Sequence, residues 1–442
     1  MRSPLPRPAP PSRREVIAAT AGGAVLLAGW PSFADETKAL DVPPELQQRM
    51  YAAALDSAKR HVRGGEPGSP YPQPFVDAAF SSHIFLWDTC FIAAYAKYHQ
   101  DELPIQAALD NFYLRQDPDG FICREYDAQG RPFWPKDHPV SINPPLLAFA
   151  ELELFSRVPD HARLKAVYPR LVSFFQFLMT HYRGDDGLFF SDALGSGMDN
   201  IPRYPDGWRD DGRGIPLHNL YPKVFDYELL SSKWNRQGRS VDFSAQMALF
   251  ADELAQIARI VGQKRDISRW RDAHADISGA INAHCWSEVD GFYYDLGYGA
   301  QIRRKHIGMF WTLLAGVASR DQARKMIAHL MNPAEFGRRV PAPAWPADQA
   351  GFSPRGDYWM GGVWAPTNYM LLRGLRRCRA EATARQLARA YYWAVAQVFE
   401  ATGTFWENYS PDFLAPGRIA RSDFCGWTAL APIAVLREFI SV

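Results

Sequence analysis

The chain has 442 residues, of which 47% are hydrophobic and 22% charged, a composition that excludes an intrinsically disordered chain. Its 49 Lys and Arg residues are balanced by 48 Asp and Glu residues. The chain therefore lacks the basic excess of proteins that bind nucleic acids or anionic membrane surfaces, and we expect neither partner. Aromatic residues make up 14%, with 14 Trp. Many Trp residues in a neutral chain favour stacking on flat neutral ligands such as sugars, although Trp also fills large cores.

Residues 1–34 have the pattern of an export signal. Arg13 and Arg14 form a twin-arginine pair before the apolar stretch 16–30, and the Ser-Phe-Ala sequence at 32–34 offers a small-x-small cleavage site. The apolar stretch is too short and glycine-rich to span a membrane, which takes about 20 residues. We therefore expect a periplasmic or secreted protein, folded before export through the twin-arginine pathway and without a membrane anchor. A basic leader in front of a buried helix is the alternative.

After residue 43 the dominant pattern is helical, with apolar residues at i, i+3, i+4 and i+7. It predicts helices at 44–64, 83–99, 101–117, 143–156, 160–183, 239–261, 265–286, 302–315, 319–331, 363–376, 380–401 and 424–439. Short extended segments are expected at 187–190 and 291–295. Long connections follow the odd-numbered helices and short ones the even-numbered helices, and short connections make neighbours antiparallel. The alternation predicts an all-α (α/α)6 barrel of six helical hairpins with the long loops on one face, as a single domain over 35–442.

The five cysteines are Cys90, Cys123, Cys285, Cys378 and Cys425, and they lack the spacing of a zinc site. Their odd number and folding before export argue against a disulfide framework. No loop has the spacing of an EF-hand. We expect no catalytic metal and no cofactor, while a structural Ca²⁺ and the oligomeric state are left open.

The unusual residue combinations lie in the long loops and at the starts of the following helices, where rigid scaffolds often carry functional residues. Carboxylates stand there beside Trp and Arg, in the segments 85–89, 119–125, 195–203, 358–369, 404–411 and 423–427. Cleavage of a glycosidic bond needs two carboxyl groups, one protonated and one ionised. Aromatic rings can stack on the apolar face of a sugar. These segments therefore predict a site for a small carbohydrate.

Structural roles compete with this interpretation at several positions. The Asp-Asn pair at 199–200 is compatible with an Asx turn, and the Arg-Glu pair at 124–125 with a local ion pair. The two glycines at 361–362 are compatible with close packing. Glu407 is harder to explain in this way, because a carboxylate among aromatic neighbours is costly to bury without a purpose.

Taken in order, these segments resemble elements of glycoside hydrolase family 63 and of the related trehalases of family 37. Both are inverting α-glycosidases with (α/α)6 barrels. The sequence at 197–203, Gly-Met-Asp-Asn-Ile-Pro-Arg, resembles the family's G-x-D-N-S-P-R loop, which implies that Asp199 is the general acid. Trp-Glu-Asn-Tyr-Ser-Pro at 406–411 resembles the x-E-x-Y-x-P element, which implies that Glu407 is the general base. The segments at 85–88, 121–125 and 358–369 resemble the Trp-Asp, I-x-R-E and Y-W-x-G-x-V-W-x-x-x-N-Y elements.

The resemblance extends from about residue 85 to 435 and implies a set of residues that contact the sugar. These are Trp87, Asp88, Arg124, Glu125, Asn200, Arg203, Trp359, Trp364, Asn368, Trp406 and Tyr409. It implies an exo-acting, α-glucosidase-like hydrolase of a small α-linked oligosaccharide or glycoside. Ile201 replaces the usual Ser, and residues 412–414 interrupt the usual sequence after the base, changes that bear mainly on the leaving group. The length resembles that of compact bacterial members, which include hydrolases of mannosylglycerate and glucosylglycerate, but the sugar, linkage and leaving group stay open.

Two other classes of function stay open on the sequence. Polysaccharide lyases and unsaturated glucuronyl hydrolases also use (α/α)6 barrels. Lyases usually need a Tyr or His base and a group that neutralises a uronate, and the basic residues within the motifs are Arg124 and Arg203. A non-catalytic sugar-binding barrel would have lost one of the two carboxylates, and both are present.

Overall fold

The computed structural model describes residues 40–78, 81–134, 136, 141–191, 195–203, 238–424 and 426–441. The described residues from 41 onwards belong to one compact unit. The leader prediction for residues 1–34 and the cysteine at position 425 lie outside the described residues. The other four cysteines form no disulfide.

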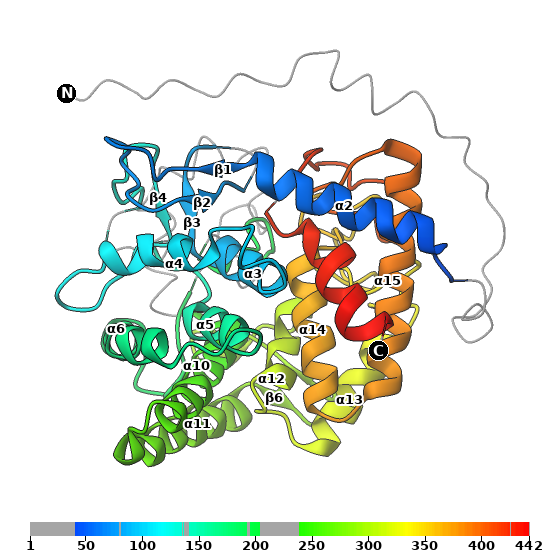
Figure 1. Cartoon of the computed structure of the whole chain (residues 1–442). Coiled ribbons are helices and arrows are strands. Elements are labelled where there is room, and N and C mark those ends of the chain that lie inside the picture. The colour runs from blue at the N-terminus through cyan, green and yellow to red at the C-terminus, as the bar shows by residue number, and fades with distance from the viewer. Residues whose placement is uncertain are drawn as a thin grey trace, which may run out of the picture. The chain divides into compact units, whose positions relative to one another are not determined.

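The helices of the described part follow the predicted order (Figure 1). They are α2 Pro44–Arg60, α3 Leu86–Ala96, α4 Ile105–Leu114, α5 Leu147–Phe155, α6 His161–His181, α10 Val241–Ile260, α11 Lys264–His284, η2 Ile307–Phe310 running into α12 Trp311–Leu314, α13 Arg320–Met331, α14 Ala365–Arg377, α15 Glu381–Thr402, and η3 Thr428–Leu430 running into the π-helix η4 Ala431–Ile440. Each overlaps one of the twelve expected ranges. The prediction of a predominantly helical protein is confirmed.

The helices fall into two groups that differ in how many of their residues are buried. Every residue of α3 is buried, and α10 is buried over most of its circumference. In contrast, α11 buries only Trp270, Ile277 and Ile281, and α13 also buries a single stripe. A helix that is apolar all round lies inside a protein, whereas one with a single apolar stripe lies on its surface. The sequence pattern thus distinguishes inner helices from the outer helices that cover them.

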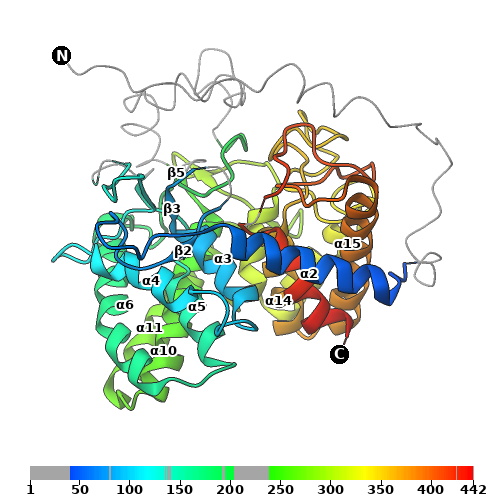
Figure 2. The same ribbon diagram turned by 45° about the horizontal axis from the view of Figure 1, so that its top comes forward.

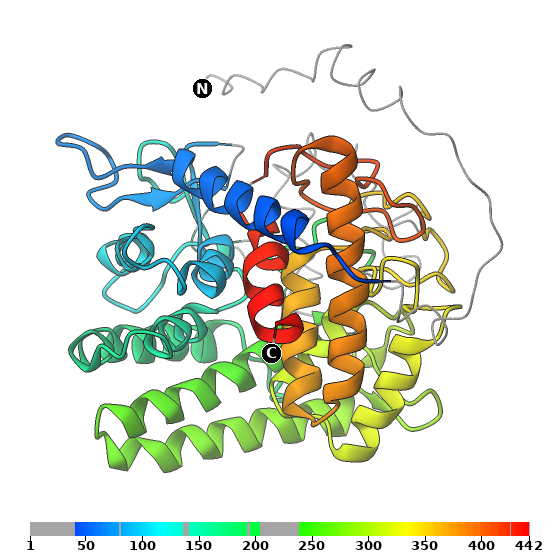
Figure 3. The same ribbon diagram turned by 45° about the vertical axis from the view of Figure 1, so that its right-hand side comes forward.

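The inner helices form a closed ring. α3 contacts α5, α5 contacts α10, α10 contacts α12, α12 contacts α14, α14 contacts η3 and η4, and η3 and η4 contact α3. The long outer helix α11 packs against α10, and α15 packs against α14 (Figure 3). The first and last inner helices, α3 and η4, therefore complete a ring whose members are distant in the sequence.

Short antiparallel strand pairs join the loops between helices. β1 Val62–Arg63 pairs with β2 Phe75–Val76, β3 Ile84–Phe85 with β4 Glu125–Tyr126, β6 Trp286–Ser287 with β7 Phe292–Tyr293, and β8 Leu296–Gly297 with both β5 Gly238–Arg239 and β9 Ala300–Gln301. β7 lies in the extended segment expected at 291–295, and Phe189 of the segment at 187–190 forms an isolated bridge with Arg183. In Figure 2, β3 and β5 lie at the same end of the helices as the loop after α15.

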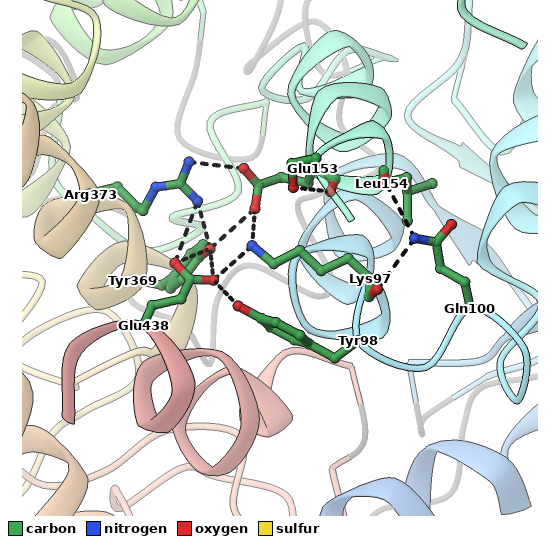
Figure 4. A network of polar contacts seen from close by, with 9 residues as sticks. Lys97, Tyr98, Gln100, Glu153, Leu154, Tyr369, Arg373 and Glu438 are labelled. Atoms are coloured by element: carbon green, nitrogen blue, oxygen red, sulfur yellow. Dashed lines mark hydrogen bonds and ion pairs between the residues drawn. The ribbon is translucent and has the colours of Figure 1, made fainter. Parts of the chain in front are cut away.

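A buried ionic network joins inner helices where the ring closes (Figure 4). Lys97, which follows α3, pairs with Glu153 of α5 and lies 2.7 Å from Glu438 of η4. Arg373 of α14 donates to the same Glu153 at 2.9 Å, and Tyr369 donates to Glu438 at 3.0 Å. Burial alone would raise the pKa of Glu153, but Arg373 and Lys97 outweigh it and lower that pKa to about 2. The network thus holds a fully ionised carboxylate between two cations.

Candidate active site

Two carboxylates from distant parts of the chain meet at one tyrosine. Asp199 is half-buried in the segment 195–203, and Glu407 is buried in the loop after α15. The hydroxyl of Tyr358 lies 3.5 Å from Asp199 Oδ2 and 3.5 Å from Glu407 Oε1. Asp199 Oδ2 and Glu407 Oε1 are therefore separated by at most twice 3.5 Å. This maximum separation falls in the lower part of the range of about 6.5–9.5 Å between the two catalytic carboxyl groups of inverting glycosidases.

The carboxyl group of Glu407 has a strongly shifted pKa. Burial raises this pKa to about 7. The positive charge of Arg421 and the Arg421 backbone N–H, which donates to Oε2 at 3.2 Å, partly oppose the rise. The negative charge of Asp199 adds to the rise, and the Tyr358 hydroxyl opposes it. A carboxyl group with a pKa near neutrality is basic enough to accept a proton and is ionised in a large fraction of molecules around pH 7, as a general base requires.

Tryptophan side chains pack against Tyr358 and against the loop that carries Glu407. The rings of Trp359 and Trp364 stack in parallel, with centroids 3.9 Å apart and planes inclined by 3°. Trp87 and Trp427 pack edge-on against each other, and each also contacts one of the stacked rings. The indole N–H of Trp427 donates to the backbone carbonyl of Glu407 at 3.1 Å. This hydrogen bond joins the aromatic cluster to the loop that carries Glu407.

Asp88 contributes a second perturbed carboxyl group in the first turn of α3. Within the described residues its Oδ1 atom is buried and has no hydrogen-bond partner. Burial raises its pKa well above the usual range, the charges of Glu125 and Glu407 act in the same direction, and the charge of Arg124 opposes them. The Arg124 guanidinium lies over the ring of Trp134, 4.7 Å from its centroid. A buried oxygen without a partner is a group that a ligand hydroxyl could satisfy.

Two of the predicted sugar-contacting residues are already bound to protein groups. Both carboxylate oxygens of Glu125 are occupied, one by His83 at 2.7 Å and the other by the Trp134 indole N–H at 2.6 Å. Arg203 is buried and forms a two-pronged ion pair with Asp242 of α10. Arg203 therefore anchors the end of the segment 195–203 to the inner helix.

Four further residues predicted to contact the sugar form contacts within the protein. The side-chain amides of Asn200 and Asn368 form hydrogen bonds with backbone groups. Trp406 is half-buried, and its indole N–H donates back to the end of α15. Tyr409 is buried and pairs through its backbone with Val363. These contacts bring the loops that carry the two carboxylates and the stacked Trp rings together.

Sequence reasoning did not single out Tyr358 and Trp427 as site residues. Tyr358 begins the Y-W-x-G element, and Trp427 ends the segment 423–427, so both stood within motifs that the sequence had marked. Their roles depend on contacts across the fold, which the motif alone does not give. Among the described residues, no group of three or more His, Cys, Asp and Glu side chains could hold a metal ion. No helix in that part of the chain is both long and apolar enough to cross a membrane.

Comparison with known proteins places the chain in a family. The sequence model described as "Mannosylglycerate hydrolase MGH1-like glycoside hydrolase domain" matches residues 81–428. The chain belongs to this family. It therefore belongs among the glycoside hydrolases of family 63, an inverting clan, and the resemblance to family 63 is confirmed. Membership argues against the lyase alternative.

Individual relatives agree with the family assignment. The chain is 24% identical over 334 residues to an uncharacterized protein of Borreliella burgdorferi, an alignment that covers 74% of this chain and 64% of that protein. It is 27% identical over 421 residues to the mannosylglycerate hydrolase of Rubrobacter radiotolerans, covering 80% and 91%. Trehalases match over shorter stretches, as the resemblance to family 37 implied.

The fold is shared with a solved family 63 enzyme. The mannosylglycerate hydrolase of Thermus thermophilus, in complex with Tris and D-glycerate, superposes with a TM-score of 0.68 at 23% identity. The superposition covers 87% of this chain and 99% of that protein. Family 63 and family 37 enzymes are (α/α)6 barrels, in agreement with the closed ring of inner helices.

Proposed function

We propose that this chain is an exo-acting, inverting α-glycosidase in which Asp199 is the general acid and Glu407 the general base. The observation that carries the proposal is the buried Glu407 carboxyl group, with a pKa of about 7, linked to Asp199 through one tyrosine hydroxyl. The pair supplies the two proton-transfer groups that glycosidic cleavage requires.

In this mechanism Asp199 donates its proton to the glycosidic oxygen as the bond to the anomeric carbon breaks. Glu407 removes a proton from a water molecule, whose oxygen forms the new bond to the anomeric carbon from the opposite face. An α-glycoside thereby yields a β-hemiacetal and a free alcohol, and the acid and base return to their starting states through solvent. Asp88 and Arg124 lie near enough to share this electrostatic environment and would hold ring hydroxyls.

The proposed substrate is a small α-linked mannoside or glucoside. The relatives named as mannosylglycerate hydrolases support a sugar joined to a short acid, and the trehalases support a second sugar as leaving group. We further propose that the ring of inner helices is an (α/α)6 barrel with the site at the end where the long loops gather, and that residues 1–34 direct export. Release of residues 1–34 would be tested by N-terminal sequencing of protein recovered from the periplasm.

Product analysis tests the reaction. The wild-type protein would be incubated with mannosylglycerate, glucosylglycerate, trehalose and an oligosaccharide that contains a saturated uronate, and the first product followed by NMR. Hydrolysis of an α-glycoside with initial release of the β-anomer supports the proposal. Initial release of the α-anomer from mannosylglycerate or glucosylglycerate, or an unsaturated product, contradicts it. Inverting cleavage of trehalose should give equal amounts of α- and β-glucose, because the leaving glucose keeps its α configuration, so release of α-glucose alone also contradicts it.

Substrates with poor and good leaving groups distinguish the role of Asp199 as acid from that of Glu407 as base. Asp199→Asn removes the acid, so it should abolish cleavage of poor leaving groups but retain part of the activity on glycosyl fluorides, which need little protonation. Glu407→Gln removes the base and should lose activity on both substrate types. Equal losses in the two variants on both substrates would contradict this assignment of acid and base.

A further inference from the structure

The side-chain amide of Asn200 joins the segment of the proposed acid to the backbone on both sides of Tyr358. Its Nδ2 donates to the carbonyl of Asp357 at 3.1 Å, and its Oδ1 accepts the backbone N–H of Trp359 at 2.9 Å. Asn200 is buried, with 6% of its surface exposed. Its amide is therefore committed to the protein, on the residues directly before and after the tyrosine.

The backbone of Tyr358 needs such support. Its φ angle of 59° lies in the left-handed region, which is strained for a residue with a side chain. Its carbonyl accepts the Gly362 backbone N–H at 3.0 Å, and a Cβ atom at position 362 would lie only 2.0 Å from that carbonyl oxygen. A strained conformation persists only where surrounding contacts determine it, and the Asn200 amide supplies two of those contacts.

We propose that Asn200 is a positioning residue that holds the Tyr358 hydroxyl between the two carboxylates. Asn200 directly follows Asp199 in the sequence. The same short segment therefore carries the proposed acid and, through the Asn200 side-chain amide, holds the tyrosine that contacts both the acid and the base. The inference rests on the proposed roles of Asp199 and Glu407. It gives Asn200 a different role from the sugar contact that the family resemblance implied.

The hydroxyl acts on Glu407 by stabilising its ionised form. The charged and titratable groups around Glu407 are Asp88, Asp199, Tyr358 and Arg421, of which Tyr358 and Arg421 favour the carboxylate and the two aspartates disfavour it. Loss of the tyrosine hydrogen bond would leave the carboxylate less stabilised. The pH at which the base becomes ionised would then rise.

The test is the pH profile of kcat/KM in a double-mutant cycle. Tyr358→Phe should move the acidic limb upward by about 0.5–1 pH unit, the effect of losing one hydrogen bond that is weak because it is 3.5 Å long. Asn200→Ala should move the limb in the same direction, and the double variant should shift no further than Tyr358→Phe alone. Because Asn200 acts through the tyrosine, kcat should fall while KM stays within about twofold.

Two further variants keep the experiment decisive. Asn111→Ala removes a buried amide of α4 that donates to the Gln73 carbonyl at 2.9 Å, and it should leave the limb in place even if it lowers stability. Asn200→Ser adds no charge beside the carboxylates, and its side chain is too short to join the Asp357 carbonyl to the Trp359 N–H, so it provides the measurement if Asn200→Ala does not fold. It too should move the limb upward.

The outcomes separate this inference from the proposed function. An unmoved limb in the folded Asn200 variant, a shift that adds to that of Tyr358→Phe, or a rise in KM at constant kcat would each overturn the positioning role. Full activity in Asp199→Asn or Glu407→Gln would instead overturn the proposed function. Loss of activity in those two variants with an unmoved limb in the Asn200 variant would refute the inference alone.

Discussion

Glu407 and Glu153 are equally buried, each with 6% of its surface exposed, yet their pKa values are shifted in opposite directions. Glu407 has a pKa of about 7, because burial outweighs the charge of Arg421, one backbone N–H and one tyrosine hydroxyl. Glu153 has a pKa of about 2, because Arg373 and Lys97 both bind it directly. Burial therefore does not decide the charge of a buried carboxyl group, whereas a directly bound cation does.

The difference separates a group suited to proton transfer from one suited to holding helices together. A carboxylate fixed in its ionised form between two cations cannot exchange a proton near neutral pH, but it can join α3, α5 and α14. A carboxyl group left without a bound cation is costly to the fold and available for catalysis. The comparison predicts that Glu407 affects rate, and Glu153 affects stability.

The largest expected effect is on the rate of Glu407→Gln. Loss of a general base should lower kcat by about 10²–10⁴-fold, while the free energy of unfolding at pH 8 stays the same or rises because a poorly solvated carboxylate has been removed. Steady-state kinetics and urea unfolding measure the two quantities. A variant that keeps more than a tenth of the wild-type rate would show that Glu407 is not the base.

Glu153→Gln should do the reverse. Among the described residues it leaves Lys97 and Arg373 with Glu438 as their one carboxylate partner, so we expect the free energy of unfolding to fall by about 3 kcal/mol, the lower end of the range for breaking a buried ion pair. The folded fraction should keep its kcat. The control is Glu400→Gln, whose pair with Arg49 is 3.5 Å long and exposed, and which should cost less than about 1 kcal/mol. Equal losses in the two variants would remove the distinction between these glutamates.

The stability of the protein should depend on pH in opposite ways through the two groups. The pKa of Glu407 is raised from 4.5 to about 7, so the folded state binds the extra proton and stability falls as pH rises through this window. The pKa of Glu153 is lowered from 4.5 to about 2, so its contribution is present above pH 4.5 and is lost as pH falls towards 2. Between pH 4.5 and 8, Glu407→Gln should remove a decline of about 3 kcal/mol in the free energy of unfolding. Urea unfolding at several pH values measures this decline, and an identical pH dependence in wild type and variant would contradict it.

The smallest expected effect is on the acidic limb of the activity profile. Because the base must be ionised, kcat/KM should fall about tenfold for each pH unit below about 7, as Glu407 becomes protonated. Glu153→Gln should leave the limb where it is. A wild-type limb below pH 5 would mean that the acidic limb reports a different group.

The sequence by itself determined the helices and the carboxylates on which the site depends. Helical periodicity is a local property, so the twelve ranges could be read from apolar spacing, and the order of the motifs marked Asp199 and Glu407. The sequence placed one helix start too early for a local reason. A helix was expected over 302–315, but the chain becomes helical only from Ile307, after the two-residue strand β9, which is too short to show an alternating hydrophobic pattern.

Only the tertiary structure decided which polar groups have partners. Asn200 meets the carbonyl of a residue 157 positions away, Arg203 meets Asp242 of an inner helix, and the charge of Glu153 depends on Arg373, 220 positions further along. Hydrogen bonds, ion pairs and desolvation depend on distance in space, and spacing along the chain does not encode them. For this reason two glutamates that are equally buried carry opposite pKa shifts, and the fold alone shows which of them is free to exchange a proton.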